Sequence, residues 1–296
     1  MEILPFFEVN MNIKCGKLAF KISHDKRWDI PINAKKFEDN DNEIDIYYRI
    51  KFVDSIKYNN EPIICQREHI LVTKNDYNFE SRYLMIPGNF YPYAYYREDD
   101  DKKICIEIIN DFKNSFTIDA MFWSLFALEK HLMKEESIIF HCSYMVYREH
   151  AVLFSGPSGI GKSTQSRLWE KNRNTRIING DRALLEKEDK CWYVNGWPVC
   201  GSSEICINEK HKLGSIVFLE KGNKNSVIYL ERKDAIKKLI SQITINYWNK
   251  DFVNKAISLA ENIVDNIKIY ELTCTPDIEA VKVLEKFLEE NEEWIH

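Results

Sequence analysis

The sequence lacks any run of about 20 apolar residues, the length that a helix needs to cross a bilayer. Its first ten residues, MEILPFFEVN, include Glu2 but no basic region, so a signal peptide is not expected. Basic residues are in the minority, and the formal net charge of -5 argues against a surface that coats nucleic acid. We therefore expect a cytoplasmic protein that binds neither membranes nor nucleic acid.

The cysteines also lack a recognisable pattern. The chain has 8 of them, but they form no CxxC pair and no His/Cys spacing of the kind that holds a metal ion. Cys65 and Cys105 each lie within an apolar, strand-like run. Buried free thiols in a reducing compartment are the simplest interpretation.

No internal repeat or low-complexity segment divides the 296 residues, which are enough for one large or two smaller domains. Residues 1–112 consist of short β-branched and aromatic runs with partial alternation, which predicts a β-rich region that could recognise an acceptor. The tyrosines of residues 91–96 could form a peptide-binding surface, but their alternation favours a half-buried strand. Residues 113–296 form the second expected domain.

Helical patterns dominate parts of this second region. Residues 117–134 predict one strongly apolar helix, and residues 232–248 and 250–266 predict two amphipathic helices. Near the C-terminus, Thr275 is a candidate N-cap, with Pro276 in the first turn of a last helix. Buried strands are expected between these segments.

Residues 156–163, GPSGIGKS, match the pattern G-x-x-x-x-G-K-[ST], in which backbone N–H groups cradle phosphates. A strand is expected over residues 151–155 and a helix from Gly161 to Lys171, which is the context that the motif requires. Lys162 is expected to reach the β- and γ-phosphates, and the Ser163 hydroxyl to bind Mg²⁺. The expected nucleotide-binding residues are Gly156, Pro157, Ser158, Gly159, Ile160, Gly161, Lys162, Ser163 and Thr164.

Four other residues are candidates for the chemistry. Asp181 ends the strand-like run RIING and could bind Mg²⁺ or accept a proton, although it could also be an ordinary turn residue. His141 could donate a hydrogen bond to a phosphate or tune that acid, or it could be structural. Arg182 could stabilise transferred charge or pair with an acid. Glu204 could be a second metal ligand or a first-turn helix residue.

These segments together resemble the HPr kinase/phosphorylase-related, serine-kinase-like family. FHCSYMVY, FSGPSGIGKST, INGDRALL and YELTCTPDIEAVKVL carry the likeness, which covers residues 138 to 285. The resemblance implies a fold that contains both helices and strands (α/β, or α+β), with a mixed sheet flanked by helices. Its P-loop core is expected to be the one that the family shares with ATP-dependent phosphoenolpyruvate carboxykinases. It also implies that Asp181 is the general base and His141 a catalytic residue, while Lys162 and Ser163 hold phosphate and metal.

The chain departs from the family at three points. The family has two adjacent aspartates where this chain has Gly180 and Asp181. WPVCGSSEICINEK replaces the family's glycine-rich signature, so the match at Glu204 is loose. No arginine follows Arg232, so the family's later catalytic arginine has no counterpart. HPr is therefore a poor candidate substrate.

The sequence leaves more than one function open. The first is a kinase that uses ATP and Mg²⁺ to phosphorylate a hydroxyl, most simply a serine in a peptide, in a small protein or as the free amino acid. The second is a nucleotide-binding regulatory module without transfer activity. Carboxykinase-like chemistry and hydrolytic ATPase activity are weaker alternatives. An oligomer is possible.

Overall fold

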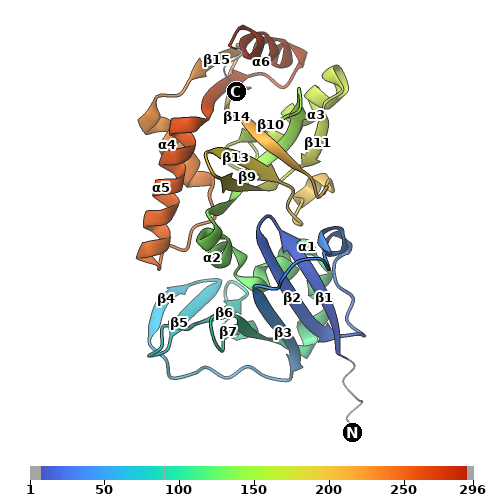
Figure 1. Ribbon diagram of the computed structural model, residues 1–296, viewed down its shortest axis with the longest axis vertical. Helices are drawn as coiled ribbons and strands as arrows, with labels where there is room; N and C mark the ends of the chain where they lie inside the picture. Colours follow the sequence, from blue (N-terminus) through green and yellow to red (C-terminus); the bar gives the residue numbers. More distant parts are fainter. Residues whose placement is uncertain (1–7, 90, 292–296) are drawn as a thin grey trace. The chain divides into compact units, whose positions relative to one another are not determined.

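The computed structural model describes residues 8–89 and 91–291, and the chain divides into two compact units, Met1–Leu128 and Glu129–His296. Each unit contains a mixed β-sheet flanked by helices, so the protein is of the mixed α/β class (Figure 1). The contacts divide the chain after Leu128, whereas the sequence suggested a boundary after residue 112. All eight cysteines are free. In the described ranges no helix is both long and apolar enough to cross a bilayer.

The first unit is built on an eight-stranded sheet in the order β1-β2-β3-β8-β7-β6-β5-β4. The β2–β3 and β3–β8 pairs are parallel, and the other pairs are antiparallel. The strands are β1 (Glu8–Cys15), β2 (Leu18–Asp25), β3 (Ile46–Val53), β4 (Ile63–Arg67), β5 (Ile70–Lys74), β6 (Glu80–Met85), β7 (Pro92–Glu98) and β8 (Lys103–Ile109). Its helical segments are η1 (Ile32–Phe37), η2 (Asn110–Thr117), α1 (Asp119–Trp123) and η3 (Ser124–Phe126).

Aromatic packing keeps the end of this unit on its sheet. Along β3 the residues alternate between buried and exposed, as the two-residue period of a strand requires. The buried ring of Tyr48 packs edge-on against Phe126 at 4.9 Å, and its hydroxyl donates to the Phe126 carbonyl at 2.8 Å. Trp28 also contacts Phe116 and Phe122. These contacts explain why residues 113–128 belong to the first unit.

The single helix expected over residues 117–134 is wrong. The segment forms α1, η3, α2 (Leu128–Leu132) and η4 (Met133–Glu135) instead. Ala127 has a φ of 49°, a left-handed conformation that a continuous α-helix cannot contain. The apolar pattern was real, because Phe122, Trp123 and Phe126 are all buried, but it belongs to several short turns.

The second unit contains a sheet in the order β10-β9-β12-β13-β14-β16-β15, with β11 paired to β9. Its strands are β9 (Ser137–Tyr147), β10 (His150–Ser155), β11 (Arg176–Asn179), β12 (Arg182–Glu188), β13 (Cys191–Asn195), β14 (Lys210–Lys221), β15 (Ser226–Tyr229) and β16 (Lys268–Cys274). Its longer helices are α3 (Lys162–Arg173), α4 (Arg232–Gln242), α5 (Lys250–Asn266) and α6 (Ile278–Glu290), and η5 (Gly201–Ser203) is a short turn. β10, β14 and β16 run parallel to one another.

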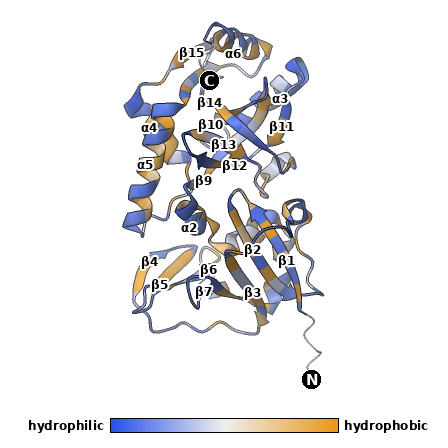
Figure 2. Cartoon of the chain, viewed as in Figure 1, coloured by the Kyte–Doolittle hydropathy of each residue, from blue (hydrophilic) through white to orange (hydrophobic). Residues whose placement is uncertain are grey.

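Helices cover both faces of this parallel part. Ile216 and Phe218 of β14 belong to the core shared with α4 and α5, whereas Val217 and Leu219 belong to the core shared with α3 and α6. Figure 2 shows both hydrophobic and hydrophilic residues along α4 and α5, as expected of helices with one buried face. β14 is thus the central strand of a three-layered arrangement that ends, at its carboxyl edge, beside the GPSGIGKS loop.

Two helix boundaries differ from those expected. α4 ends at Gln242, where Ile243 turns to extended backbone, rather than continuing to residue 248. The N-cap of α6 is Asp277 rather than Thr275, because the Asp277 carboxylate accepts from the Glu279 N–H at 3.0 Å. The Thr275 hydroxyl instead donates to Asp277 at 2.8 Å.

Candidate active site

The GPSGIGKS loop connects β10 to α3, in the strand, loop and helix order that the motif requires. Gly156, Gly159 and Gly161 have φ values of 138°, 76° and 118°, which residues with side chains rarely adopt. At Gly156 an added Cβ would also lie 3.2 Å from the Ile160 side chain. The glycines therefore allow a curled backbone that places the start of α3 at the end of the loop. Pro157, Ser158 and Thr164 are exposed along it.

Lys162 begins α3, and its side chain folds back onto the loop. Its ammonium donates to the carbonyls of Gly156 at 2.8 Å and Pro157 at 3.1 Å. Lys162 is only 7% exposed. Burial lowers the pKa of the Lys162 ammonium, while Cys142 and Asp181 act in the opposite direction. A buried cation whose partners are two neutral carbonyls would form a stronger, charge-assisted hydrogen bond with a phosphate anion.

A pocket of about 350 Å³ opens beside this loop. Gly159, Gly161 and Thr164 form one wall, and the residues that follow β14 and β16 form another. Ligands commonly bind in such a place, outside the carboxyl ends of parallel strands. The lining residues beyond the loop are Gln165, Lys221, Gly222, Cys274 and Pro276.

Gln165 is a buried residue of α3 that lines this pocket. It is 2% exposed, and its amide nitrogen donates to Cys274 Sγ at 3.2 Å and the Thr275 carbonyl at 3.4 Å. Its amide oxygen is buried, and no donor reaches it from any described residue. The curled loop and the buried cation, rather than this oxygen, are what fit the phosphates of a nucleoside triphosphate.

His141 and Asp181 lie together on the other side of the loop. In the β9–β12 pairing His141 is opposite Arg182, so Asp181 comes just before that pair. His141 Nε2 lies 3.7 Å from Asp181 Oδ1, and Arg182 Nε donates to Asp181 Oδ2 at 3.3 Å. Both members of the His141–Asp181 pair are 29% exposed. The structure thus brings His141 next to Asp181 and Arg182, which lie about 40 residues later in the sequence.

The tautomer of His141 follows from Gln242. His141 Nδ1 lies 3.1 Å from the Gln242 amide oxygen, which can only accept, so Nδ1 carries the hydrogen and Nε2 faces Asp181. Burial and the charge of Lys162 lower the pKa of His141, whereas Asp181 and Gln242 raise it. Since the net shift is downward, we treat His141 as neutral near pH 7 and its contact with Asp181 as one between two acceptors.

The two predicted metal ligands are placed differently. Ser163 Oγ lies 3.4 Å from the Gly180 carbonyl, next to Asp181. A hydroxyl and a carboxylate are hard oxygen ligands, and Mg²⁺ commonly uses one or two such groups together with phosphates and water. Glu204 follows η5 and is exposed. Among residues 8–89 and 91–291, no three His, Cys, Asp or Glu side chains converge as a metal site by themselves.

Position 180 has room only for glycine. A Cβ atom at Gly180 would lie 2.2 Å from Ser203 Oγ and 2.3 Å from Ser203 Cβ. A Cβ atom at Gly201 would in turn lie 3.0 Å from Asp181 Cβ. The turn of residues 200–204 therefore interlocks with residues 180–181 through two glycines. Sequence reasoning missed this contact, and also missed Gln165 and Gln242, which belong to no motif. It missed Asn179, although this residue lies within INGDRALL, because its bonds to the Trp197 and Val199 carbonyls cannot be predicted from that motif.

Comparisons with known proteins add little. No family model matches the chain, and no curated protein matches it. One similar solved structure is that of the Hpr(Ser) kinase/phosphatase from Coxiella burnetii, with 12% sequence identity and a TM-score of 0.33. The alignment covers 52% of this chain and 98% of that chain. A likeness this distant carries no argument about function, which must be inferred from the geometry.

The interlocked glycines predict that Gly180→Ala is destabilising. The added methyl group must displace Ser203, so the free energy of unfolding should fall by about 1–3 kcal/mol, as for other overpacked sites. Urea unfolding measures this change. As a matched control, Gly180→Ala should cost less in a Ser203→Gly background, where the clashing atoms are gone. Equal costs in both backgrounds would contradict the contact.

The lowered pKa of His141 predicts a pH dependence of stability. Below its ordinary value of 6.5 the unfolded chain binds a proton that the folded chain binds less readily, so the free energy of unfolding should fall as the pH decreases. His141→Gln removes the imidazole that binds this proton. The dependence of the free energy of unfolding on pH should therefore become flatter below about pH 6.5. Urea unfolding of both proteins over this range measures the difference. Identical slopes would show that His141 binds its proton equally in both states.

Proposed function

We propose that the chain is an ATP-dependent kinase that uses Mg²⁺ and transfers the γ-phosphoryl group to a hydroxyl. The observation that carries this proposal is the meeting of α3 with the acidic turn. Ser163 Oγ lies 3.4 Å from the Gly180 carbonyl, and His141 Nε2 lies 3.7 Å from Asp181 Oδ1. A phosphate-binding loop and a candidate base thus share one site.

Each residue has a role that follows from its position. Lys162 and the N-terminal N–H groups of α3 neutralise the phosphate chain. Ser163 would supply a hydroxyl ligand to Mg²⁺, which would screen the transferred charge when bound. Asp181 accepts the proton of the acceptor hydroxyl. The oxygen of that hydroxyl bonds to the γ-phosphorus, while the bond from the γ-phosphorus to the bridging oxygen breaks and ADP leaves. His141 Nε2 is a second acceptor 3.7 Å from that carboxylate and tunes it.

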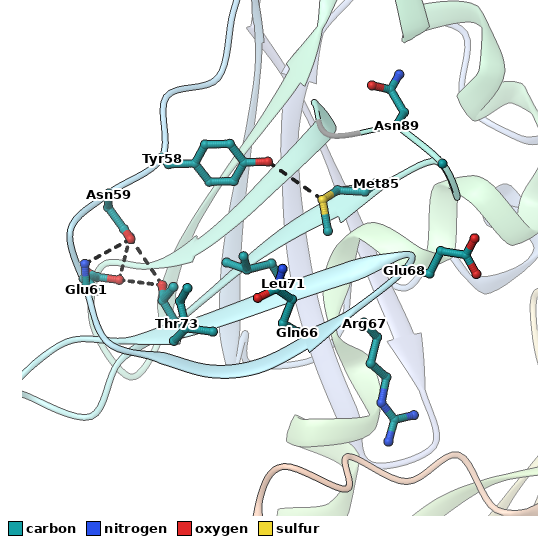
Figure 3. Close-up of a pocket in the computed structure, with 12 residues that line it drawn as sticks. Tyr58, Asn59, Glu61, Gln66, Arg67, Glu68, Leu71, Thr73, Met85 and Asn89 are labelled. Atoms are coloured by element: carbon teal, nitrogen blue, oxygen red, sulfur yellow. Dashed lines mark hydrogen bonds between the residues drawn. The ribbon is translucent and has the colours of Figure 1, made fainter.

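A groove in the first unit supports a peptide or small protein as the acceptor. It has a volume of about 760 Å³ and lies beside β4, the last strand of the sheet, whose residues are all exposed or half-buried. Figure 3 shows Tyr58 and Met85 on one side of it, with the Tyr58 hydroxyl 3.8 Å from the Met85 sulfur. Leu71 and Ile63 add apolar surface. An extended peptide can pair with such an edge strand.

Hydrogen bonds hold this groove in shape. The Asn59 N–H donates to the Tyr83 hydroxyl at 2.8 Å, and the Asn59 side chain donates to Glu61 at 2.6 Å. Thr73 also donates to Glu61 at 2.8 Å. Residues 59–61, between β3 and β4, are therefore fixed by these bonds. A groove with fixed walls reduces the entropy cost of binding a peptide. Serine within a peptide is accordingly our preferred acceptor over free serine.

The proposal predicts transfer of label from γ-labelled ATP. With Mg²⁺ present, label should move to serine-containing peptides, a small protein in cell extract or free serine. Asp181→Asn should lower the rate by about 10²–10⁴-fold, since that is the usual contribution of a general base. Asp189→Asn, which changes an exposed turn residue, is the matched control and should have no effect.

Nucleotide binding separates the alternatives. If the protein binds ATP but transfers label to no acceptor, and Asp181→Asn changes nothing, a nucleotide-binding regulatory module replaces the kinase. Label that appears only as inorganic phosphate, at a rate unaffected by any acceptor, would instead indicate an ATPase.

A further inference from the structure

Asn179, the last residue of β11, is fully buried immediately before the acidic turn. Its amide oxygen accepts from the N–H groups of Asp181 at 2.8 Å and Arg182 at 3.0 Å. Its amide nitrogen donates to the carbonyls of Trp197 at 2.7 Å and Val199 at 3.1 Å. All four bonds go to backbone groups, so this one side chain ties two segments of backbone together.

The orientation of this amide is determined by its partners. Two N–H donors face one end and two carbonyl acceptors face the other. Exchanging the oxygen and the nitrogen would place donors against donors and acceptors against acceptors, which is unfavourable for every contact. Among the common side chains, only an amide of this length offers an acceptor and two donors in this arrangement.

The first segment held by Asn179 is the peptide of Asp181. Asn179 accepts from its N–H, and the N–H of Cys142 on β9 donates to its carbonyl at 3.1 Å. The backbone of Asp181 is therefore fixed on both sides. A fixed backbone fixes the Cβ atom of Asp181 and leaves its carboxylate only the staggered rotamers to choose from, and Arg182 Nε donates to the one adopted. A base that must meet one hydroxyl needs such a restricted position.

The second segment is the one that covers Asp181. The carbonyls of Trp197 and Val199 lead into the turn of residues 200–204, where Gly201 comes close to the Asp181 side chain. Asn179 thus sets the distance between the acid and the turn above it. A loss of the two donated bonds would release this turn and allow the carboxylate to rotate.

We propose that Asn179 is the positioning residue of Asp181. It holds the carboxylate at the place where the acceptor hydroxyl must come and does not itself touch substrate. This inference rests on the proposed kinase function. A purely structural role for a buried, fully bonded asparagine is the alternative, and it would affect stability without acting through Asp181.

A double-mutant cycle distinguishes the two roles. Asn179→Ala should lower the transfer rate kcat by about 10–100-fold, because small misplacements of a reacting group have effects of this size. The dissociation constant for ATP should change little, since the side-chain hydrogen bonds of Asn179 go to Asp181, Arg182, Trp197 and Val199 rather than to the GPSGIGKS loop. In an Asp181→Asn background the same change should have almost no further effect on kcat, because the positioned group is already absent.

Two controls make the result specific. Asn195→Ala removes another buried asparagine of the same sheet, one that pairs with Leu184 and Lys210 rather than with the acidic turn, and it should leave kcat unchanged. Asn179→Asp retains an oxygen for both N–H groups and should transfer at least several-fold faster than Asn179→Ala. If thermal melting shows that Asn179→Ala does not fold, Asn179→Asp takes its place in the cycle. That substitution should then lower kcat only when Asp181 is present.

The outcomes separate this inference from the proposed function. Transfer by the unchanged protein, with equal losses from the Asn179 change in both backgrounds, overturns the positioning role and leaves the kinase intact. No transfer by the unchanged protein overturns the kinase, and the role of Asn179 with it. Non-additive losses with unchanged ATP binding support both.

Discussion

The parallel pairing of β10 with β14, and of β14 with β16, is the constraint on which the candidate site depends. Parallel strands end at the same edge, so the loop after β10 lies beside the residues that follow β14 and β16. Because β14 alternates its side chains between two helical layers, this edge cannot shift without disturbing both cores. The fold therefore fixes the position of Lys162 before any ligand is considered.

Electrostatics connects this edge to the acid. Lys162 is buried, and within residues 8–89 and 91–291 its ammonium donates to two carbonyls of its own loop and to no carboxylate, so its charge is incompletely compensated. The same charge helps to keep His141 neutral, and Asp181 raises the pKa of Lys162 in return. A phosphate would complete the compensation. The acid, the histidine and the lysine thus form one electrostatic system rather than three separate residues.

What could be predicted from the sequence was local. The curled loop and the helix that begins at Lys162 follow from glycines and a lysine at fixed spacing, and most strands follow from alternation. The broken helix around Ala127 could not be predicted, because the aromatic residues there pack against the sheet when the backbone forms short turns instead of one helix. The need for glycine at position 180 depends on Ser203, and the role of Asn179 depends on carbonyls near residue 198. Such contacts arise only when distant segments meet.

Binding of nucleotide to the loop is the central claim, and calorimetric titration with a non-hydrolysable ATP analogue and Mg²⁺ tests it most directly. One molecule should bind per chain, and Lys162→Ala should weaken binding by about 10–100-fold, since a bond between an ammonium and a phosphate contributes about 1.5–3 kcal/mol. Lys171→Ala, an exposed change later in α3, should leave the affinity unaltered. Absence of binding, or equal binding by the unchanged protein and Lys162→Ala, would contradict the account.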